Sequence, residues 1–210
     1  MLSLISQLRQ KEHGVMKTQD NTIEITLTGT APLLMHNGQL ADPLNEGVKA
    51  MKKISGKRSK TEADHEELAR LEFQGSLYMG DDGPVLPAHV LEAAIIAGAK
   101  KSKDGPRAKT GVFVSNNARL EYDGPRDREG LWADDDFRLV APVVISRSRI
   151  MRTRPLFKDW SAKVEIIFQP DICDKQDVVK WCEAAGYLVG LCDWRPRYGR
   201  FEVQNGQGPK

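Results

Sequence analysis

The chain has 210 residues, of which 40% are hydrophobic and 29% charged, and its 31 lysines and arginines nearly balance its 29 aspartates and glutamates. This composition is typical of one soluble globular domain and excludes collagen-like, coiled-coil and fully disordered chains. The longest apolar stretch, residues 90–99, is interrupted by Glu92 and is much shorter than the ~20 residues of a membrane span. Because the N-terminal residues also lack the pattern of a signal peptide, we expect a cytoplasmic protein.

The first half of the chain predicts a strand, an insertion and a helix. Residues 22–28 alternate apolar and polar side chains, several of them β-branched, which is the pattern of a half-buried strand. Residues 32–75 predict an insertion, in which a long basic loop precedes an acidic helix with Thr61 and Asp64 at its capped start. Pro87 then stands where helices begin, and apolar residues recur at helical spacing, which predicts a helix over 87–101.

The second half completes an α+β pattern. We expect strands over 139–150 and 162–169, a helix over 174–190 with Asp174 as its N-cap, a strand over 199–204, and a frayed tail at 205–210. The resulting order, β-α-β-β-α-β, predicts a ferredoxin-like (RRM-like) core with insertions after the first strand and after the first helix, as one domain over residues 1–210. Such a fold leaves one face of its antiparallel sheet open, and RRM-type proteins bind RNA there.

Two segments carry chemistry suited to nucleic acid. The first, the basic ribbon of residues 147–158, contains no acidic residue. Its basic residues are Arg147, Arg149, Arg152, Arg154 and Lys158. In an extended chain, residues two apart share a face, and arginine forks bind phosphates through two parallel hydrogen bonds. The alternative is a solvated strand edge whose charges oppose aggregation.

The second segment is the 190–201 loop, which is bracketed by glycines. It combines Arg195, Arg197 and Arg200, which can neutralise phosphates, with Trp194 and Tyr198, which can stack on bases. The alternative is a turn whose aromatic rings close the core while its arginines cap helix carbonyls. Basic and aromatic residues interleaved in this way favour binding of single-stranded nucleic acid.

Three stretches together resemble the RAMP superfamily. Residues 85–94, with a proline leading into a helix, resemble its signature segment, the 190–201 loop resembles its glycine-rich loop, and residues 34–43 resemble the loop after its first strand. The nearest branch comprises the backbone subunits of CRISPR surveillance complexes. The resemblance implies head-to-tail copies, a sequence-independent grip on a guide RNA, and guide contacts by Arg195, Arg197 and Arg200, with His36 and Asn37 as further contacts.

The same resemblance offers an enzymatic alternative. In the branch that cuts target RNA, an aspartate in the loop after the first strand is catalytic, and Asp42 is the position that matches. A carboxylate there can hold Mg²⁺, although an Asx turn before Pro43 is the interpretation we favour. The histidines and cysteines show no ligand spacing with one another, so we expect no resident metal and no cofactor.

These observations favour a binding protein over an enzyme. The leading prediction is a non-catalytic, largely sequence-independent binder of single-stranded nucleic acid, RNA in the first place. It would be a repeating subunit of a nucleoprotein filament or of a CRISPR-like effector complex in antiviral defence, with copies of itself and other effector-complex subunits as partners. The alternatives are a metal-dependent endoribonuclease using Asp42 and a phage or plasmid single-stranded DNA-binding or annealing protein. The predicted contact residues are His36, Asn37, Arg147, Arg149, Arg152, Arg154, Trp194, Arg195, Arg197, Tyr198 and Arg200.

Overall fold

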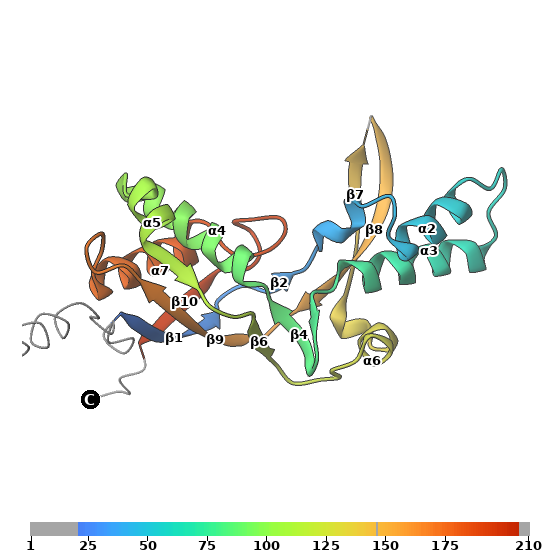
Figure 1. Cartoon of the computed structure of the whole chain (residues 1–210). Helices are drawn as coiled ribbons and strands as arrows, with labels where there is room; N and C mark the ends of the chain where they lie inside the picture. The colour runs from blue at the N-terminus through green and yellow to red at the C-terminus, as the bar shows by residue number, and fades with distance from the viewer. Residues whose placement is uncertain (1–20, 146, 206–210) are drawn as a thin grey trace, which may run out of the picture.

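A computed structural model describes residues 21–145 and 147–205, which form a mixed α+β fold with antiparallel sheets (Figure 1). The larger sheet has the strand order β10-β1-β9-β6-β4-β3, and β5 also pairs with β9. Its strands are β1 (Thr22–Gly29), β3 (Met79–Gly80), β4 (Gly83–Leu86), β5 (Val112–Val114), β6 (Ala118–Glu121), β9 (Ser161–Phe168) and β10 (Phe201–Asn205). The predicted strand over 22–28 is confirmed, and its apolar residues Ile23, Ile25 and Leu27 are buried.

Two helices cover one face of this sheet. They are α4 (Ala88–Ala99) and α7 (Lys175–Leu188), which match the helices predicted over 87–101 and 174–190. Side chains from both helices meet Ile25 of β1 and Val164 of β9 around one small interior space, so both helices pack on the same side. The helices also touch each other, because a Cβ added at Gly98 would lie 2.3 Å from the Trp181 carbonyl oxygen. Pro87 is the N-cap of α4, and the Asp174 carboxylate caps α7 as predicted.

The prediction of one core strand over 139–150 is wrong. Instead, β7 (Arg138–Ile145) and β8 (Ser148–Phe157) form a hairpin that, with β2 (Leu33–Leu34), makes a separate three-stranded sheet. The chain reverses at Arg147, whose φ of 68° lies in the left-handed region used in tight turns. In the larger sheet, β5 and β6 take the place beside β9. The hairpin projects beyond the rest of the fold (Figure 1).

The predicted insertion folds as a pair of helices beside this hairpin (Figure 1). After the short turn η1 (Gly38–Ala41) come α2 (Glu46–Ser55), within the predicted basic loop, and α3 (Glu62–Ser76). The capping box of α3 is formed by Thr61 and Asp64, as predicted. Near its end, α3 buries Glu72, Phe73 and Ser76. Short elements complete the fold: η2 (Lys100–Ser102), α5 (Gly105–Gly111), α6 (Arg128–Ala133) and η3 (Asp135–Phe137).

Two remaining expectations concern the tail and the membrane. Residues 206–210 of the predicted frayed tail lie outside the described residues, whereas Asn205 belongs to β10. Among the helices of the described ranges, none combines the length and the apolar character that crossing a lipid bilayer requires.

Candidate nucleic-acid interface

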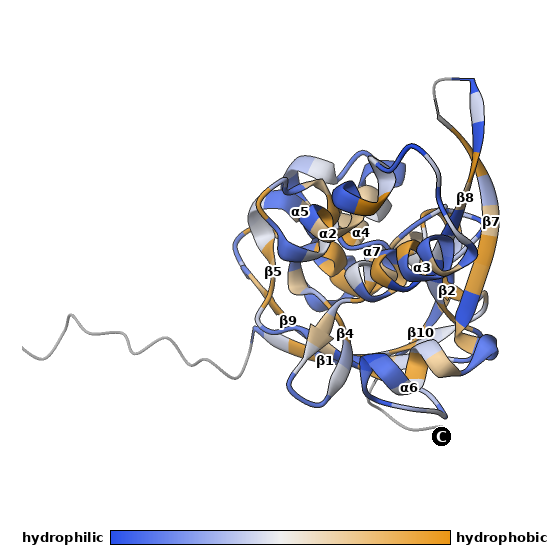
Figure 2. Ribbon diagram, turned by 90° about the vertical axis from the view of Figure 1, so that its right-hand side faces the viewer, coloured by the Kyte–Doolittle hydropathy of each residue, from blue (hydrophilic) through white to orange (hydrophobic). Residues whose placement is uncertain are grey.

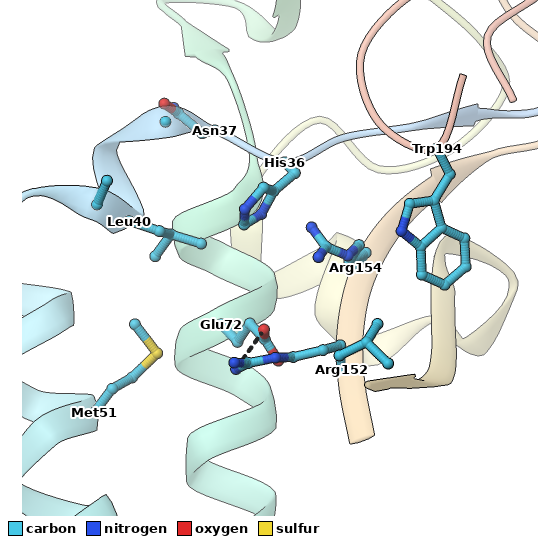
Figure 3. Close-up of a pocket in the computed structure, with 11 residues that line it drawn as sticks. His36, Asn37, Leu40, Met51, Glu72, Arg152, Arg154 and Trp194 are labelled. Carbon is cyan, nitrogen blue, oxygen red and sulfur yellow. Dashed lines mark hydrogen bonds and ion pairs between the residues drawn. The ribbon is translucent and has the colours of Figure 1, made fainter. Parts of the chain in front are cut away.

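Five of the predicted contact residues line one cavity of about 540 Å³ (Figure 3). They come from three segments far apart in the chain, and we call the hollow that they share the arginine cavity. These residues are His36 and Asn37 after β2, Arg152 and Arg154 on β8, and Trp194 in the 190–201 loop. The structure therefore brings together the basic ribbon, the loop after the first strand and the aromatic loop.

The short strand β2 brings the three segments together. Its two residues pair with Leu156 and Phe157 of β8, and the next amide, Met35 N–H, donates to the Pro155 carbonyl at 3.0 Å. That register places the following residue, His36, close to Arg154 (Figure 3). On its other side, the Leu34 carbonyl accepts from the Asp193 N–H at 2.9 Å, which holds the 190–201 loop beside the same strand.

Asn37 organises the rim of the cavity. Its side-chain oxygen accepts from the Gln39 N–H at 3.0 Å, which caps η1, and its amide group donates to the Leu77 carbonyl at 3.1 Å. Because these bonds tie the segment after β2 to the end of α3, Asn37 holds His36 in place. Asn37 is therefore first a positioning residue of this cavity.

The two cavity arginines share one face of β8 because they are two residues apart. Arg152 Nη1 lies 3.0 Å from Glu72 Oε1, and the other carboxylate oxygen of Glu72 accepts from the Thr153 N–H at 3.0 Å. This buried carboxylate therefore holds both the side chain of Arg152 and the edge of β8. About a third of the Arg152 side chain remains exposed, at 34%.

Arg154 is the most buried cation of the site. Its side chain is 10% exposed, Nη1 lies 2.9 Å from Asp193 Oδ2, and Cζ lies 5.9 Å from the centre of the Trp194 ring. The contact with Asp193 lacks hydrogen-bond geometry, so Nε, Nη1 and the carboxylate oxygen have no aligned hydrogen-bond partner. Buried donors without partners are costly, so this pair is held at a cost in stability.

The pKa of His36 depends on its burial and on the charges around the cavity. Burial lowers the pKa of the imidazole from 6.5, and the charges of Arg154 and Arg152 lower it further, while Asp193 opposes the shift. The imidazole is therefore mainly neutral at neutral pH. In that form it donates one hydrogen bond and accepts another.

The backbone of the 190–201 loop presents Trp194 at the cavity. Cys192 and Trp194 have φ of 60° and 49°, a left-handed conformation that is uncommon for such residues and concentrates at functional sites. At the base of the loop, Leu191 N–H donates to the Gly199 carbonyl at 2.9 Å. A Cβ at Gly199 would lie 2.1 Å from the Leu191 carbonyl oxygen, so this close approach requires glycine. The Tyr198 ring lies 5.9 Å from the Trp194 ring, beside the cavity.

The other predicted contacts do not line the arginine cavity. Arg195 and Arg197 are exposed on the 190–201 loop next to Trp194, and no carboxylate of the described residues pairs with them. Arg200 lines a different hollow, beside Glu183 and Glu202. The remaining two predicted arginines lie farther out on the hairpin.

The two arginines near the hairpin tip are exposed. Arg147 lies in the turn between β7 and β8, so it does not continue the alternation of the strand. Arg149 lies on β8, on the face opposite to that of Arg152 and Arg154. The arginines of the basic ribbon therefore lie in two places: Arg152 and Arg154 at the cavity, and the other two near the hairpin tip. Lys158, at its end, pairs with Asp136.

Asp42, the residue of the enzymatic alternative, makes an Asx-type turn. Its exposed carboxylate accepts from the Leu44 N–H at 2.8 Å, which is the interpretation that the sequence favoured. Asp42 does not line the arginine cavity. Over the described parts of the chain, no three His, Cys, Asp or Glu side chains are grouped so as to hold a metal ion.

Glu72 and Asp193 are the site residues that sequence reasoning missed. Glu72 belongs to an acidic helix whose carboxylates appear equivalent in sequence, and only the packing of α3 on β8 distinguishes it. Asp193 adjoins Trp194 in a segment whose arginines dominate the pattern. Neither pairing has a sequence signal, because both partners are distant in the chain.

No protein-family model matches the chain, and no curated protein matches it in sequence. The resemblance to the RAMP superfamily therefore stays a prediction, and the geometry of the arginine cavity is the basis for a functional proposal.

Proposed function

We propose that the protein is a non-catalytic binder of single-stranded RNA and that the arginine cavity holds one phosphate group and an adjacent base. The observation that carries this proposal is the convergence of Arg152, Arg154, His36 and Trp194, from three distant segments, on one hollow. Arginine and aromatic side chains that share a cavity are the combination by which single strands are bound.

The chemistry of the cavity suits any nucleotide sequence. The guanidinium of Arg154 lines the cavity, and its positive charge would pair with a phosphate there. The face of Trp194 can stack on any base, because every base has a π-face. Contacts to phosphates and base faces carry no sequence information, so binding is largely sequence-independent.

The wider proposal concerns fold family and assembly. The strand order β10-β1-β9 followed by β5 and β6, with α4 and α7 on one face, supports a ferredoxin-like core in which β5 and β6 together act as the second strand. We propose with it a relationship to the RAMP superfamily, in which copies of the chain bind a guide RNA head to tail in the cytoplasm. The exposed Arg195 and Arg197 would then extend the RNA path beyond the cavity.

Fluorescence anisotropy with a labelled twelve-nucleotide oligouridine RNA tests the proposal. Wild-type affinity should fall steeply with salt, because bound phosphates release counterions. Trp194→Leu and Arg152→Gln should each weaken binding about tenfold, since one stacked base or one charged contact contributes about 1–3 kcal/mol. Arg119→Gln, which changes an exposed arginine on β6, is the matched control and should bind like wild type. Salt-insensitive binding, or equal losses in all three variants, would refute the proposal.

Two further measurements distinguish the proposed function from its two alternatives. Competition with a DNA oligomer of matched length distinguishes RNA from DNA, because only RNA has the 2′-hydroxyl. Tighter binding of the DNA would favour a single-stranded DNA-binding protein. Incubation of the RNA with Mg²⁺ tests catalysis, and cleavage that disappears in Asp42→Ala would establish the endoribonuclease alternative.

A further inference from the structure

A second and larger hollow, of about 1080 Å³, lies between the helices α2 and α3 and the strand β8. We call it the β8 groove. Its wall on the hairpin side is made by the consecutive residues Arg149 to Thr153 of β8, with Arg138 and Val140 of β7. Because successive side chains of a strand point to opposite faces, a hollow lined by consecutive residues of β8 includes the edge of that strand as well as one face of the hairpin.

The backbone on this edge of β8 is open. Thr153 N–H donates to Glu72 and the Pro155 carbonyl accepts from Met35, so the backbone groups of these two residues point away from β7. Residues two apart on a strand point the same way, and therefore the N–H and C=O groups of Met151 and Arg149 also face the groove. Over this stretch no strand of the described chain pairs with that edge, because β2 reaches only residues 156 and 157.

The surface around the open edge is apolar with a basic rim. Val140 and Met151 are 57% and 58% exposed, and the hydrophobic residues of the projecting hairpin are visible in Figure 2. Lys52, Lys60 and Arg149 line the groove, and none of them pairs with a carboxylate of the described residues. Of the two carboxylates that line it, Glu72 is engaged by Arg152 and only Glu66 is unengaged.

The groove offers few rings on which a nucleic-acid base could stack. Its lining residues include one large aromatic side chain, Trp132, and the imidazole of His65. The guanidinium of Arg138 lies 4.4 Å from the centre of this ring, and Phe73 packs against it edge to face. Because the indole is covered in this way, the open strand edge and the aliphatic surface favour a polypeptide over RNA.

We propose that the β8 groove binds an extended segment of a partner protein, rich in aliphatic and acidic residues, which adds to β8 as a further strand. Main-chain hydrogen bonds to Met151 and Arg149 would supply the pairing. Aliphatic side chains would cover Val140 and Met151, and the acidic residues would meet Lys52 and Lys60. This docking site is separate from the proposed RNA function, although Met51, Glu72 and Arg152 line both hollows.

A phage-displayed library of linear twelve-residue peptides, selected on the purified full chain, tests the proposal. The enriched sequences should alternate aliphatic and acidic residues, and a synthetic peptide of that sequence is then measured by fluorescence anisotropy. Met151→Asp should weaken its binding at least tenfold. Leu44→Asp, at an exposed leucine outside the groove, should leave it unchanged. Both side chains are exposed, so equal thermal melting of the two variants verifies that each is folded.

Two measurements test the added strand itself. Backbone N-methylation of the peptide at alternate residues should abolish binding in one register and leave it intact in the other, because alternate amides face β8. Hydrogen exchange at the Arg149 and Met151 amides should slow when the peptide is bound.

Other outcomes would overturn the proposal. They are the absence of enriched peptides, enrichment of basic peptides, or equal binding by Met151→Asp. Protection of the Arg149 and Met151 amides by oligouridine RNA would assign the groove to nucleic acid instead. A concentration-dependent dimer that Met151→Asp disrupts would assign it to a second copy of the chain.

Discussion

The Asp193→Asn substitution should strengthen RNA binding and weaken the fold at the same time. Asp193 Oδ2 lies 2.9 Å from Arg154 Nη1, and the two side chains are 25% and 10% exposed. The carboxylate therefore occupies the side of the guanidinium that a phosphate would otherwise share. Asparagine has the same shape, keeps an acceptor oxygen and removes the negative charge.

The size of both effects follows from this geometry. A phosphate bound to Arg154 would lie about 6 Å from the Asp193 carboxylate, where two unit charges repel by about 0.7 kcal/mol in water and about 2.8 kcal/mol at an effective dielectric constant of about 20. Removing the charge should therefore tighten RNA binding between about threefold and about a hundredfold. The fold should lose about 1–3 kcal/mol, less than for a fully buried pair, because Asp193 is partly exposed.

Anisotropy with oligouridine RNA and urea unfolding measure the two effects on the same protein. Asp136→Asn is the matched control, because it removes the same charge from an exposed pair with Lys158. Its affinity should change little, and its stability should fall by at most about 1 kcal/mol. If Asp193→Asn is fully folded under the assay conditions and still binds RNA more weakly than wild type, the placement of a phosphate at Arg154 is refuted.

Three further predictions follow from single contacts. Glu72→Gln should lower the free energy of unfolding by about 1–3 kcal/mol in urea titrations, because the two donors bind different oxygens of Glu72 and glutamine has only one; an unchanged midpoint would contradict this. Burial, and then the charge of Arg154, hold the pKa of His36 below 6.5 in the folded protein. The stability of the fold should therefore decrease as the pH drops below about 6.5 towards the folded pKa. RNA affinity should rise over the same pH range. Both trends should be weaker in His36→Gln, and parallel profiles would contradict the role of this residue. Gly98→Ala should destabilise the fold by about 1–3 kcal/mol in thermal melting, since its Cβ would lie 2.3 Å from the Trp181 carbonyl oxygen; a wild-type melting curve would show that the two helices do not pack this closely.

The core helices and the first strand could be predicted because their signals are local. Alternation defines residues 22–28, and Asp174 caps its own helix. The hairpin over 138–157 could not be predicted, because its first half is a continuous apolar run, as in a buried core strand, and its second half is rich in arginine. That second half forms a strand by pairing with β7 and with the distant β2, and strand pairing leaves no periodic signal in the sequence.

The same distinction applies to the arginine cavity. Residue types suited to phosphates and bases were recognisable at Arg152, Arg154 and Trp194, since charge and aromaticity are properties of single side chains. The carboxylates that restrain the two arginines were not, because Glu72 and Asp193 meet them only in the folded chain. Charge patterns in a sequence thus indicate where binding groups are, but not how strongly their own protein neutralises them.

The cavity depends on apolar packing more than on its charges. Leu33 and Leu34 of β2 are both fully buried, and their pairing with β8 determines which face of that strand meets the 190–201 loop. A slip of one residue would turn Arg152 and Arg154 to the opposite face, away from Trp194. The buried leucines resist such a slip, since each would have to leave the core at a cost of about 1.5–3 kcal/mol. A two-residue strand with no charged group thereby determines where the cations of this cavity point.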